Sequence, residues 1–473
     1  MGVRHYKLTL TTVGPVHIGN GVNYSGKDYF KLDDKRVAVL DAKTFVSRLS
    51  PEEVDEYCEF LGADSGNSLA VFLGRHPRLE FVARECVAYR IEMKLAKARR
   101  GTDQYFPVAQ FVKDAHGCPY VPGSSVKGML RTALLAYLVQ RNPERYAALY
   151  DARATQGNDK SRACKQIERE VFWRERPNAS DEVVNDIMRY VSVSDSVPLS
   201  TDDLVFAKKY DKFSRADSGR HKLGMGKISK EAQYYEGNAL NIYRECIRPG
   251  TRIELTLDVD ERIDAYLDGL TLDDKGLLSV LEASFGLYER CFLDRFDLSG
   301  VSGAGGGGGA ADDGRCRYVY QGGPLAGRRC RNRSVGDTGY CNTHKDQAGS
   351  GSKEISCCIG GGVDFDSKTI VNALFGEGRD RVYEISRILY AQFPTKLDRS
   401  LHQELEADVR DAGFMPMGMR AMYRKGKLSK GKDDHRHWKD AELGVSPHTV
   451  KLGEVGGQKY LMGRCSLAIG EAQ

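Results

Sequence analysis

A strand-like run at residues 119–122 passes through Gly123 into a segment with the apolar spacing of a helix. Its apolar residues recur at intervals of three and four: Val126, Met129, Leu130, Ala133, Leu134, Tyr137 and Leu138. Such a stripe is typical of a helix that buries one side. We therefore expect a tight turn at Gly123, followed by a helix that Ser124 or Ser125 caps.

The start of this helix has the features of an anion-binding site. Lys127 and Arg131 lie one turn apart and off the apolar stripe, beside the free N–H groups and the positive dipole end of the helix. A nucleotide-binding P-loop is excluded, because its lysine follows the second glycine, whereas here Lys127 precedes Gly128 and Met129 follows. The alternative is an ordinary capped core helix whose basic residues are solvated.

At 473 residues the chain exceeds one compact core, so we expect an α+β protein with two domains and an insertion. The first domain, with a helical extension, is predicted over residues 1–190 and the second over 191–473. Strands are predicted at 5–13, 28–32, 36–40, 86–95, 108–113 and 118–122. A helix is expected from Ser50, where Glu53 completes a capping box.

Four features of the predicted second domain add to this organisation. Residues 240–258 alternate on both sides of Arg248-Pro249-Gly250 and predict a β-hairpin. Residues 273–297 have helical spacing, and residues 360–369 form a second glycine-rich turn into a helix. Residues 201–238 fit either a projecting arm or an ordinary long loop, and they carry Tyr210, Phe213, Met225, Tyr234 and Tyr235.

A short segment, 312–349, lies between two Gly/Ser-rich linkers and contains four potential metal ligands. Cys316, Cys330, Cys341 and His344 are spaced C-x13-C-x10-C-x2-H, and zinc takes four such ligands tetrahedrally. Because the segment has almost no apolar core, it needs a cross-link or a bound metal ion to fold. We therefore expect a structural Zn²⁺. The alternative is a tether in which these four side chains are unrelated.

The net charge of +5 is unevenly distributed. Residues 420–439 hold eight Lys/Arg and residues 316–345 hold six, which favours a polyanionic partner over a merely solvated basic surface. No apolar run is long enough to span a membrane, and Arg4, His5 and Lys7 interrupt the place of a signal peptide. We expect a cytoplasmic protein in which most of the twelve cysteines are reduced.

Four blocks together resemble the RAMP superfamily of CRISPR systems, most closely the family of fifth Csm subunits of type III-A effector complexes. They are residues 16–21 (VHIGNG), residues 120–135 around VPGSSVKG, the pair Tyr243-Arg244-Glu245 and Arg248-Pro249-Gly250, and residues 360–369. The resemblance implies two ferredoxin-like (RAMP/RRM-like) domains in an antiviral complex. It also implies a non-catalytic crRNA-binding subunit that caps the 3′ end of the guide and supports its 3′-end maturation.

The resemblance further implies partners and residue roles. The partners are crRNA, target RNA, the backbone RAMP and small Csm subunits, and a host nuclease. Residues 201–238 would wedge into the guide–target duplex, with their aromatic rings on bases. No role carries over to the zinc segment. The RNA-binding residues would be His17, Gly19, Gly21, Gly123, Ser124, Ser125, Lys127, Gly128, Arg131, Arg248, Gly361, Lys368, Arg420 and Arg424.

Catalysis has weaker support, since the chain contains neither an H-E-x-x-H motif nor a Gly-Gly-Asp-Asp polymerase signature. One alternative is a RAMP endoribonuclease in which His17 near Lys127 cleaves repeat RNA without a metal. A second would cleave target RNA with Asp28, Asp33 or Asp34. A third is a zinc-dependent regulator whose nucleic-acid binding depends wholly on residues 312–349.

Overall fold

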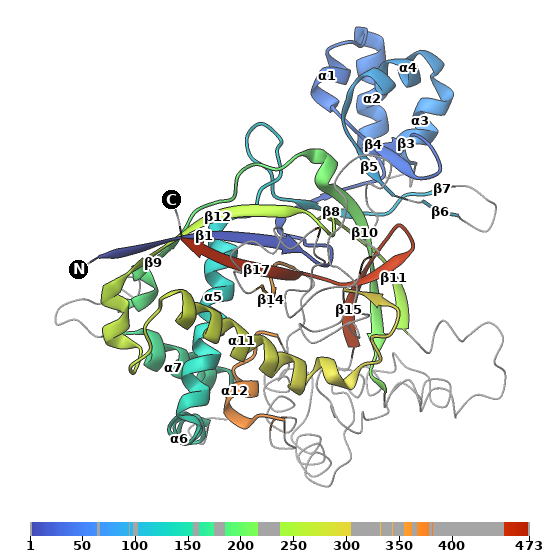
Figure 1. Ribbon diagram of the computed structural model, residues 1–473. Coiled ribbons are helices and arrows are strands. Elements are labelled where there is room, and N and C mark those ends of the chain that lie inside the picture. Colours follow the sequence, from blue (N-terminus) through green and yellow to red (C-terminus); the bar gives the residue numbers. More distant parts are fainter. Residues whose placement is uncertain are drawn as a thin grey trace, which may run out of the picture.

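The protein is mixed α+β, as predicted, with helices gathered against two curved sheets (Figure 1). The computed structural model describes residues 2–63, 67–93, 95–97, 103–154, 160–174, 185–215, 237–303, 332, 343, 354–361, 367–377, 381 and 449–471. The predicted zinc ligands, Arg420, Arg424 and residues 216–236 of the predicted arm lie outside these residues. No described helix is long and apolar enough to cross a membrane.

Five strands form the first sheet, in the order β14 (Ile355–Cys358), β17 (Arg464–Glu471), β1 (Val3–Thr12), β12 (Arg252–Asp260) and β9 (Val191–Val193). The central strand β1 pairs antiparallel with both β12 and β17. Its alternating side chains Tyr6, Leu8 and Leu10 are buried, which confirms the predicted first strand. Strands from both sides of the predicted boundary at residue 190 therefore share one sheet, and the domain division stays a prediction.

The second sheet has ten described strands, most of them in one path. The path runs β13 (Val301–Ser302), β16 (Gln458–Leu461), β15 (Thr449–Val455), β10 (Leu204–Phe213), β11 (Gly237–Ile247), β8 (Val108–Phe111) and β2 (Gly19–Tyr24). Off this path, β5 (Val87–Glu92) pairs with β10 and with β4 (Arg36–Leu40), which pairs with β3 (Tyr29–Lys31). A separate two-stranded ladder joins β6 (Ala96–Lys97) to β7 (Asp103–Gln104).

Helices cover the first sheet on one side (Figure 1). α5 (Gly123–Arg141) packs against β9, α11 (Asp274–Cys291) packs against β14, and the two helices contact each other. Their buried stripes include Val126 and Leu130 on α5 and Leu277 and Leu281 on α11, at the helical spacing that predicted both. Around them lie α6 (Pro143–Ala154), α7 (Lys160–Phe172), α12 (Val371–Phe375) and the 3-10 helices η1 (Ile187–Tyr190), η2 (Thr201–Asp203), η3 (Glu261–Tyr266) and η4 (Leu293–Arg295).

A small helical lobe lies against β3, β4 and β5 of the second sheet, at the top of Figure 1. It consists of α1 (Ala42–Val46), α2 (Pro51–Gly62), α3 (Leu69–Arg75) and α4 (Pro77–Glu85). A core of its own, with Phe45, Tyr57 and Phe72 buried together, stabilises it. The predicted capping box is confirmed, because Ser50 accepts from the Glu53 N–H and the Glu53 carboxylate accepts from the Ser50 N–H.

Several local predictions are wrong. The two halves of residues 240–258 are strands, but β11 belongs to the second sheet and β12 to the first, so they form no hairpin. The Ile247 N–H donates to the Val16 carbonyl at 2.8 Å and the Gly250 N–H donates to the Thr12 carbonyl at 2.6 Å, which directs the chain from one sheet to the other. Residues 118–122 form only an isolated bridge at Pro119, since proline lacks the N–H that a ladder needs.

The predicted arm also begins differently from the expectation. Residues 204–213 are strand β10 of the second sheet, with the side chains of Leu204, Val205 and Phe206 buried. Tyr210 is 7% exposed and lies under the Lys459 ammonium, 3.7 Å from the ring centroid. Its ring is therefore part of the protein core and is not presented to a base.

Candidate functional site

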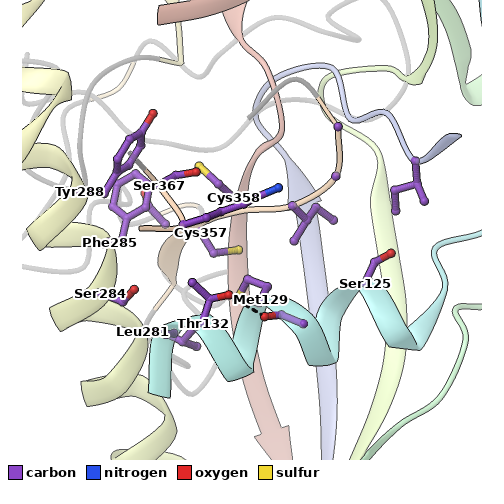
Figure 2. Close-up of a pocket in the computed structure, with 18 of the residues that line it drawn as sticks. Ser125, Met129, Thr132, Leu281, Ser284, Phe285, Tyr288, Cys357, Cys358 and Ser367 are labelled. Atoms are coloured by element: carbon purple, nitrogen blue, oxygen red, sulfur yellow. Dashed lines mark hydrogen bonds between the residues drawn. The ribbon is translucent and has the colours of Figure 1, made fainter. Parts of the chain in front are cut away.

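A pocket of about 540 Å³ opens between the start of α5, the middle of α11 and the segment from β14 to Gly361 (Figure 2). Three of the four glycine-rich or basic blocks that the sequence singled out meet here, although they lie more than a hundred residues apart. Of the predicted RNA-binding residues, those that line it are Gly19, Ser124, Ser125, Gly128, Gly361 and Lys368.

The first and fourth blocks are joined directly. The Gly361 N–H donates to the His17 carbonyl at 2.6 Å, within an isolated β-bridge. Gly360 has a φ of 83°, and a Cβ there would overlap the His17 carbonyl oxygen. Only glycine satisfies both conditions, so this contact explains Gly360, the first glycine of the fourth block.

His17 lies behind this bridge, with a side chain that is 6% exposed. Its Nδ1 is 2.7 Å from the carbonyl oxygen of Glu245, and burial lowers the pKa of the imidazole. A neutral ring whose Nδ1–H donates to this carbonyl satisfies both observations. His17 thus anchors the loop beneath Gly19 and Gly361 from inside the protein.

The start of α5 differs from the predicted capped turn. The helix begins at Gly123 after Pro122, and neither Ser124 nor Ser125 caps it, so that prediction is wrong. A Cβ at Gly123 would overlap the Val193 carbonyl oxygen, so this glycine permits close packing against β9. Its N–H donates to the Asp195 carboxylate at 2.8 Å, which leaves one donor fewer for an external anion.

Lys127 and Arg131 lie on the other side of α5. The Arg131 guanidinium forms ion pairs with Glu168 at 2.9 Å and Asp186 at 2.6 Å, and stacks on Phe172 at 4.0 Å from the ring centroid. Lys127 is half-buried, and this burial lowers the pKa of its ammonium more than nearby Asp186 raises it. The structure does not bring these two cations to the pocket, so the phosphate contact that the sequence predicts for them has no counterpart in its described lining.

The remaining predicted residues are scattered. Gly21 is exposed in β2 with a φ of 85°, and Lys368 is exposed at the rim of the pocket. Arg248 follows β11, where its N–H donates to the Asp203 carbonyl at 2.8 Å and its own carbonyl accepts from the Thr12 hydroxyl at 2.6 Å. Arg248 is thus tied into the crossing between the sheets, outside the pocket lining.

Comparison with known families matches residues 9–286 to the RAMP superfamily, a span that covers more than half of the chain. The chain belongs to the RAMP superfamily. It is 26% identical over 303 residues to the CRISPR system Cms protein Csm5 of Streptococcus thermophilus, covering 62% of this chain and 73% of that protein. It is 28% identical over 274 residues to the protein of the same name from Mycobacterium tuberculosis strain H37Rv, covering 54% and 67%.

A solved structure shares the fold of this RAMP protein. One chain of the cryo-EM structure of a Csm–crRNA–target RNA ternary complex in a type III-A CRISPR–Cas system superposes with a TM-score of 0.53. The alignment covers 98% of this chain and 100% of that chain at 16% identity. At this identity the likeness concerns the fold.

The apolar wall of the pocket was missed by the analysis of the sequence. Phe285 and Tyr288 come from α11, Met129 from α5, and Cys357 and Cys358 from β14 (Figure 2). The helical spacing of Phe285 identified it only as a core residue. A sequence signal could have come from the serines and threonine placed between these apolar residues, such as Thr132 and Ser284, which a fully buried stripe would not contain.

Glu245, in the third block, lies at the centre of a buried hydrogen-bond network. The carboxylate is fully buried and accepts from the Tyr89 hydroxyl at 2.5 Å, the Phe111 N–H at 2.8 Å and the Lys113 ammonium at 2.5 Å. The Lys113 ammonium lies 5.2 Å from the centre of the Tyr89 ring. Burial first, and the Glu245 charge second, raise the pKa of Tyr89. This network stabilises the second sheet and does not line the pocket.

The aspartates of the alternative nuclease hypothesis serve local turns. Asp28 accepts from the Ser25 N–H at 2.6 Å, Asp33 accepts from the Lys35 N–H at 2.8 Å, and Asp34 pairs with Lys31 at 2.7 Å. The Lys35 N–H is the main cause that lowers the pKa of Asp33. All three aspartates lie outside the described lining of the pocket.

Proposed function

We propose that this chain is a non-catalytic crRNA-binding subunit of a type III-A CRISPR interference complex. Its RAMP membership and its similarity to proteins named Csm5 support this role. The observation that carries the proposal is the convergence of three sequence blocks on one pocket, which Gly19, the start of α5 from Ser124 to Gly128, and Gly360, Gly361 and Lys368 line together. The described lining contains a lysine and no carboxylate, which suits a polyanion.

Within this proposal the chain caps the 3′ end of the guide RNA at the end of the complex. It contacts crRNA, target RNA, and the backbone RAMP and small Csm subunits in the cytoplasm, and recruits a host nuclease for 3′-end maturation. Its architecture is two ferredoxin-like domains, and the 312–349 segment is an accessory zinc module. The similarity to Csm5 proteins supports the assignment to this complex.

The surroundings of the candidate catalytic groups support a non-catalytic role. The His17 ring is 6% exposed and its Nδ1 is engaged with Glu245, so a 2′-hydroxyl has no free approach from that side. The aspartates in the 28–34 loop are committed to turn hydrogen bonds and ion pairs. A repeat-cleaving or target-cleaving RAMP endoribonuclease would need these groups to rearrange.

The test is a binding and cleavage assay of the full chain with labelled CRISPR repeat–spacer RNA, in EDTA and in magnesium. We expect binding without scission under both conditions. Cleavage in EDTA would overturn the proposal in favour of His17 as a base, and cleavage in magnesium alone would favour Asp28, Asp33 or Asp34. Failure to bind the RNA at all would reject the RNA-binding role.

A further inference from the structure

The pocket is lined by both aromatic and hydroxyl side chains. On the α11 side, Phe285 and Tyr288 present aromatic surface, and Ser284 lies on the same helix beside them (Figure 2). On the α5 side lie Ser125, Met129 and Thr132. An apolar, aromatic wall together with hydroxyl groups suits a flat ligand with hydrogen-bonding edges.

The aromatic wall is held rigidly. Phe285 is 9% and Tyr288 is 7% exposed, and their ring centroids are 6.0 Å apart in an edge-to-face arrangement. Tyr288 also stacks on Phe292 at 5.8 Å, and the Arg464 guanidinium lies 5.3 Å from the centre of the Phe285 ring. Because these rings are already ordered, a ligand that packs on them orders little more of the protein.

Three hydroxyl groups of the lining, two on α5 and one on α11, are uncommitted. Within the part of the chain that the structure describes, the side chains of Ser124, Ser125 and Ser284 make no hydrogen bond. Each hydroxyl both donates and accepts, so the group matches bases with different edge patterns. Gly128 adds room, since a Cβ built there has no atom within 4 Å.

The charges around the pocket restrict the ligand further. Of its described lining residues none is Asp or Glu, and the only cation is Lys368, which is exposed at the rim. An uncharged flat group therefore fits the interior, while an attached anion fits the rim. A nucleotide has this distribution of charge.

We propose that the pocket receives one unpaired nucleobase of the bound RNA, with the adjoining phosphate beside Lys368. The base packs against the Phe285 and Tyr288 side, and the Ser124, Ser125 and Ser284 hydroxyls bond its edge. This inference rests on the proposed RNA-binding function and adds to it a specific base site. A free nucleotide would offer the same chemistry, so the test includes it.

The first experiment measures the affinity of the full chain for single-stranded RNAs that each carry one abasic nucleotide, moved along the sequence. Loss of one stacked base costs roughly tenfold in affinity. We expect that loss at one position and small effects at the others. An affinity that is insensitive to every abasic position overturns the base site while leaving RNA binding intact, whereas no binding of the intact RNA rejects the proposed function.

The second experiment fills the pocket with Gly128→Leu. The matched control is Gly74→Leu on α3, because Gly74 is also a helical glycine with no atom within 4 Å of a built Cβ, and it lies in the helical lobe. Leucine is the better helix former at both sites, so folding is preserved. Gly128→Leu should bind intact RNA roughly tenfold more weakly and lose its sensitivity to the critical abasic position.

The control variant should match the wild type in affinity and in its abasic profile. An unchanged profile in Gly128→Leu overturns the proposal. Competition with AMP, UMP, GMP and CMP separates the two sources of a nucleotide. A mononucleotide that binds as tightly as the RNA overturns the RNA-base assignment, and weak competition supports it.

Discussion

The two sides of α5 offer different chemistry although their residues alternate along the chain. On one side Ser124, Ser125 and Gly128 face a pocket without described carboxylates. On the other, Arg131 contacts Glu168 and Asp186. The charge of Arg131 is thus neutralised by two partly exposed carboxylates, whereas the pocket side is lined by hydroxyls, glycines and Lys368.

This difference shows that the charge of a motif does not identify its binding side. Successive residues of a helix point about 100° apart, so Lys127 and Gly128 face different surroundings. What each side binds depends on the element packed beside it. α7 supplies Glu168 to Arg131, whereas α11 supplies Phe285 and Tyr288 to the pocket.

The largest expected effect concerns the stability of the carboxylate side. Arg131→Ala removes the partner of two carboxylates and the stacking on Phe172, so the free energy of unfolding should fall by about 2 kcal/mol. Urea unfolding measures this change. Arg141→Ala, at the end of the same helix and over Tyr137, is the control and should change stability by less than about 0.5 kcal/mol.

RNA affinity of Arg131→Ala should stay close to that of the wild type. A loss of RNA affinity with unchanged stability would contradict the assignment of RNA binding to the pocket side of α5, because it would identify Arg131 as a phosphate ligand.

The pH dependence of stability tests whether His17, which is buried behind the pocket, is held neutral in the folded protein. Burial lowers the pKa of His17 from its ordinary value of 6.5, so below that pH the unfolded chain gains a proton that the folded chain does not. Stability that is present above pH 6.5 should therefore be lost as the pH falls, by at most about 1.4 kcal/mol per pH unit from this group.

His17→Gln retains a side-chain N–H but cannot titrate, so its stability should fall less between pH 8 and pH 5. Urea unfolding of both proteins at the two pH values gives the difference. Equal losses in the two proteins would show that His17 is not held neutral.

The salt dependence of RNA binding compares Lys368, at the pocket, with Lys127, on the other side of α5. Lys368→Ala should reduce the slope of log affinity against log salt by about 0.7, the value for one phosphate contact on a single strand. Between 50 and 200 mM salt this amounts to roughly a threefold smaller change in affinity. Lys127→Ala should leave the slope unchanged, and the reverse result would assign the phosphate contact to the other side of the helix.

Deletion of the 312–349 segment should have only a small effect on RNA binding. Metal analysis of the purified chain should find about one zinc, held by Cys316, Cys330, Cys341 and His344. Deleting residues 312–349 should remove the zinc and weaken RNA binding by less than about threefold. Loss of all binding on deletion would favour the zinc-dependent regulator, and an absence of zinc would reject the metal site.

Local features of the fold were predictable because short-range patterns encode them. The alternation of β1, the capping box at Ser50 and the apolar stripes of α5 and α11 each depend on residues within a few positions. The β-hairpin prediction failed at Arg248–Gly250 for the opposite reason. Both arms are strands, but β12 pairs with β1 and β11 pairs with β10, so each arm pairs with a strand outside the predicted hairpin.

The sequence by itself determined the mixed α+β class, the main helices and strands, and the glycine-rich loops that resemble those of RAMP proteins. Only the tertiary structure decided that Gly19, Gly128 and Gly361 meet around one pocket, that Arg131 pairs with Glu168 and Asp186, and that Phe285 lines that pocket. The physical reason is that helix caps and periodicity act locally, whereas a pocket and an ion pair require side chains that long-range packing brings together.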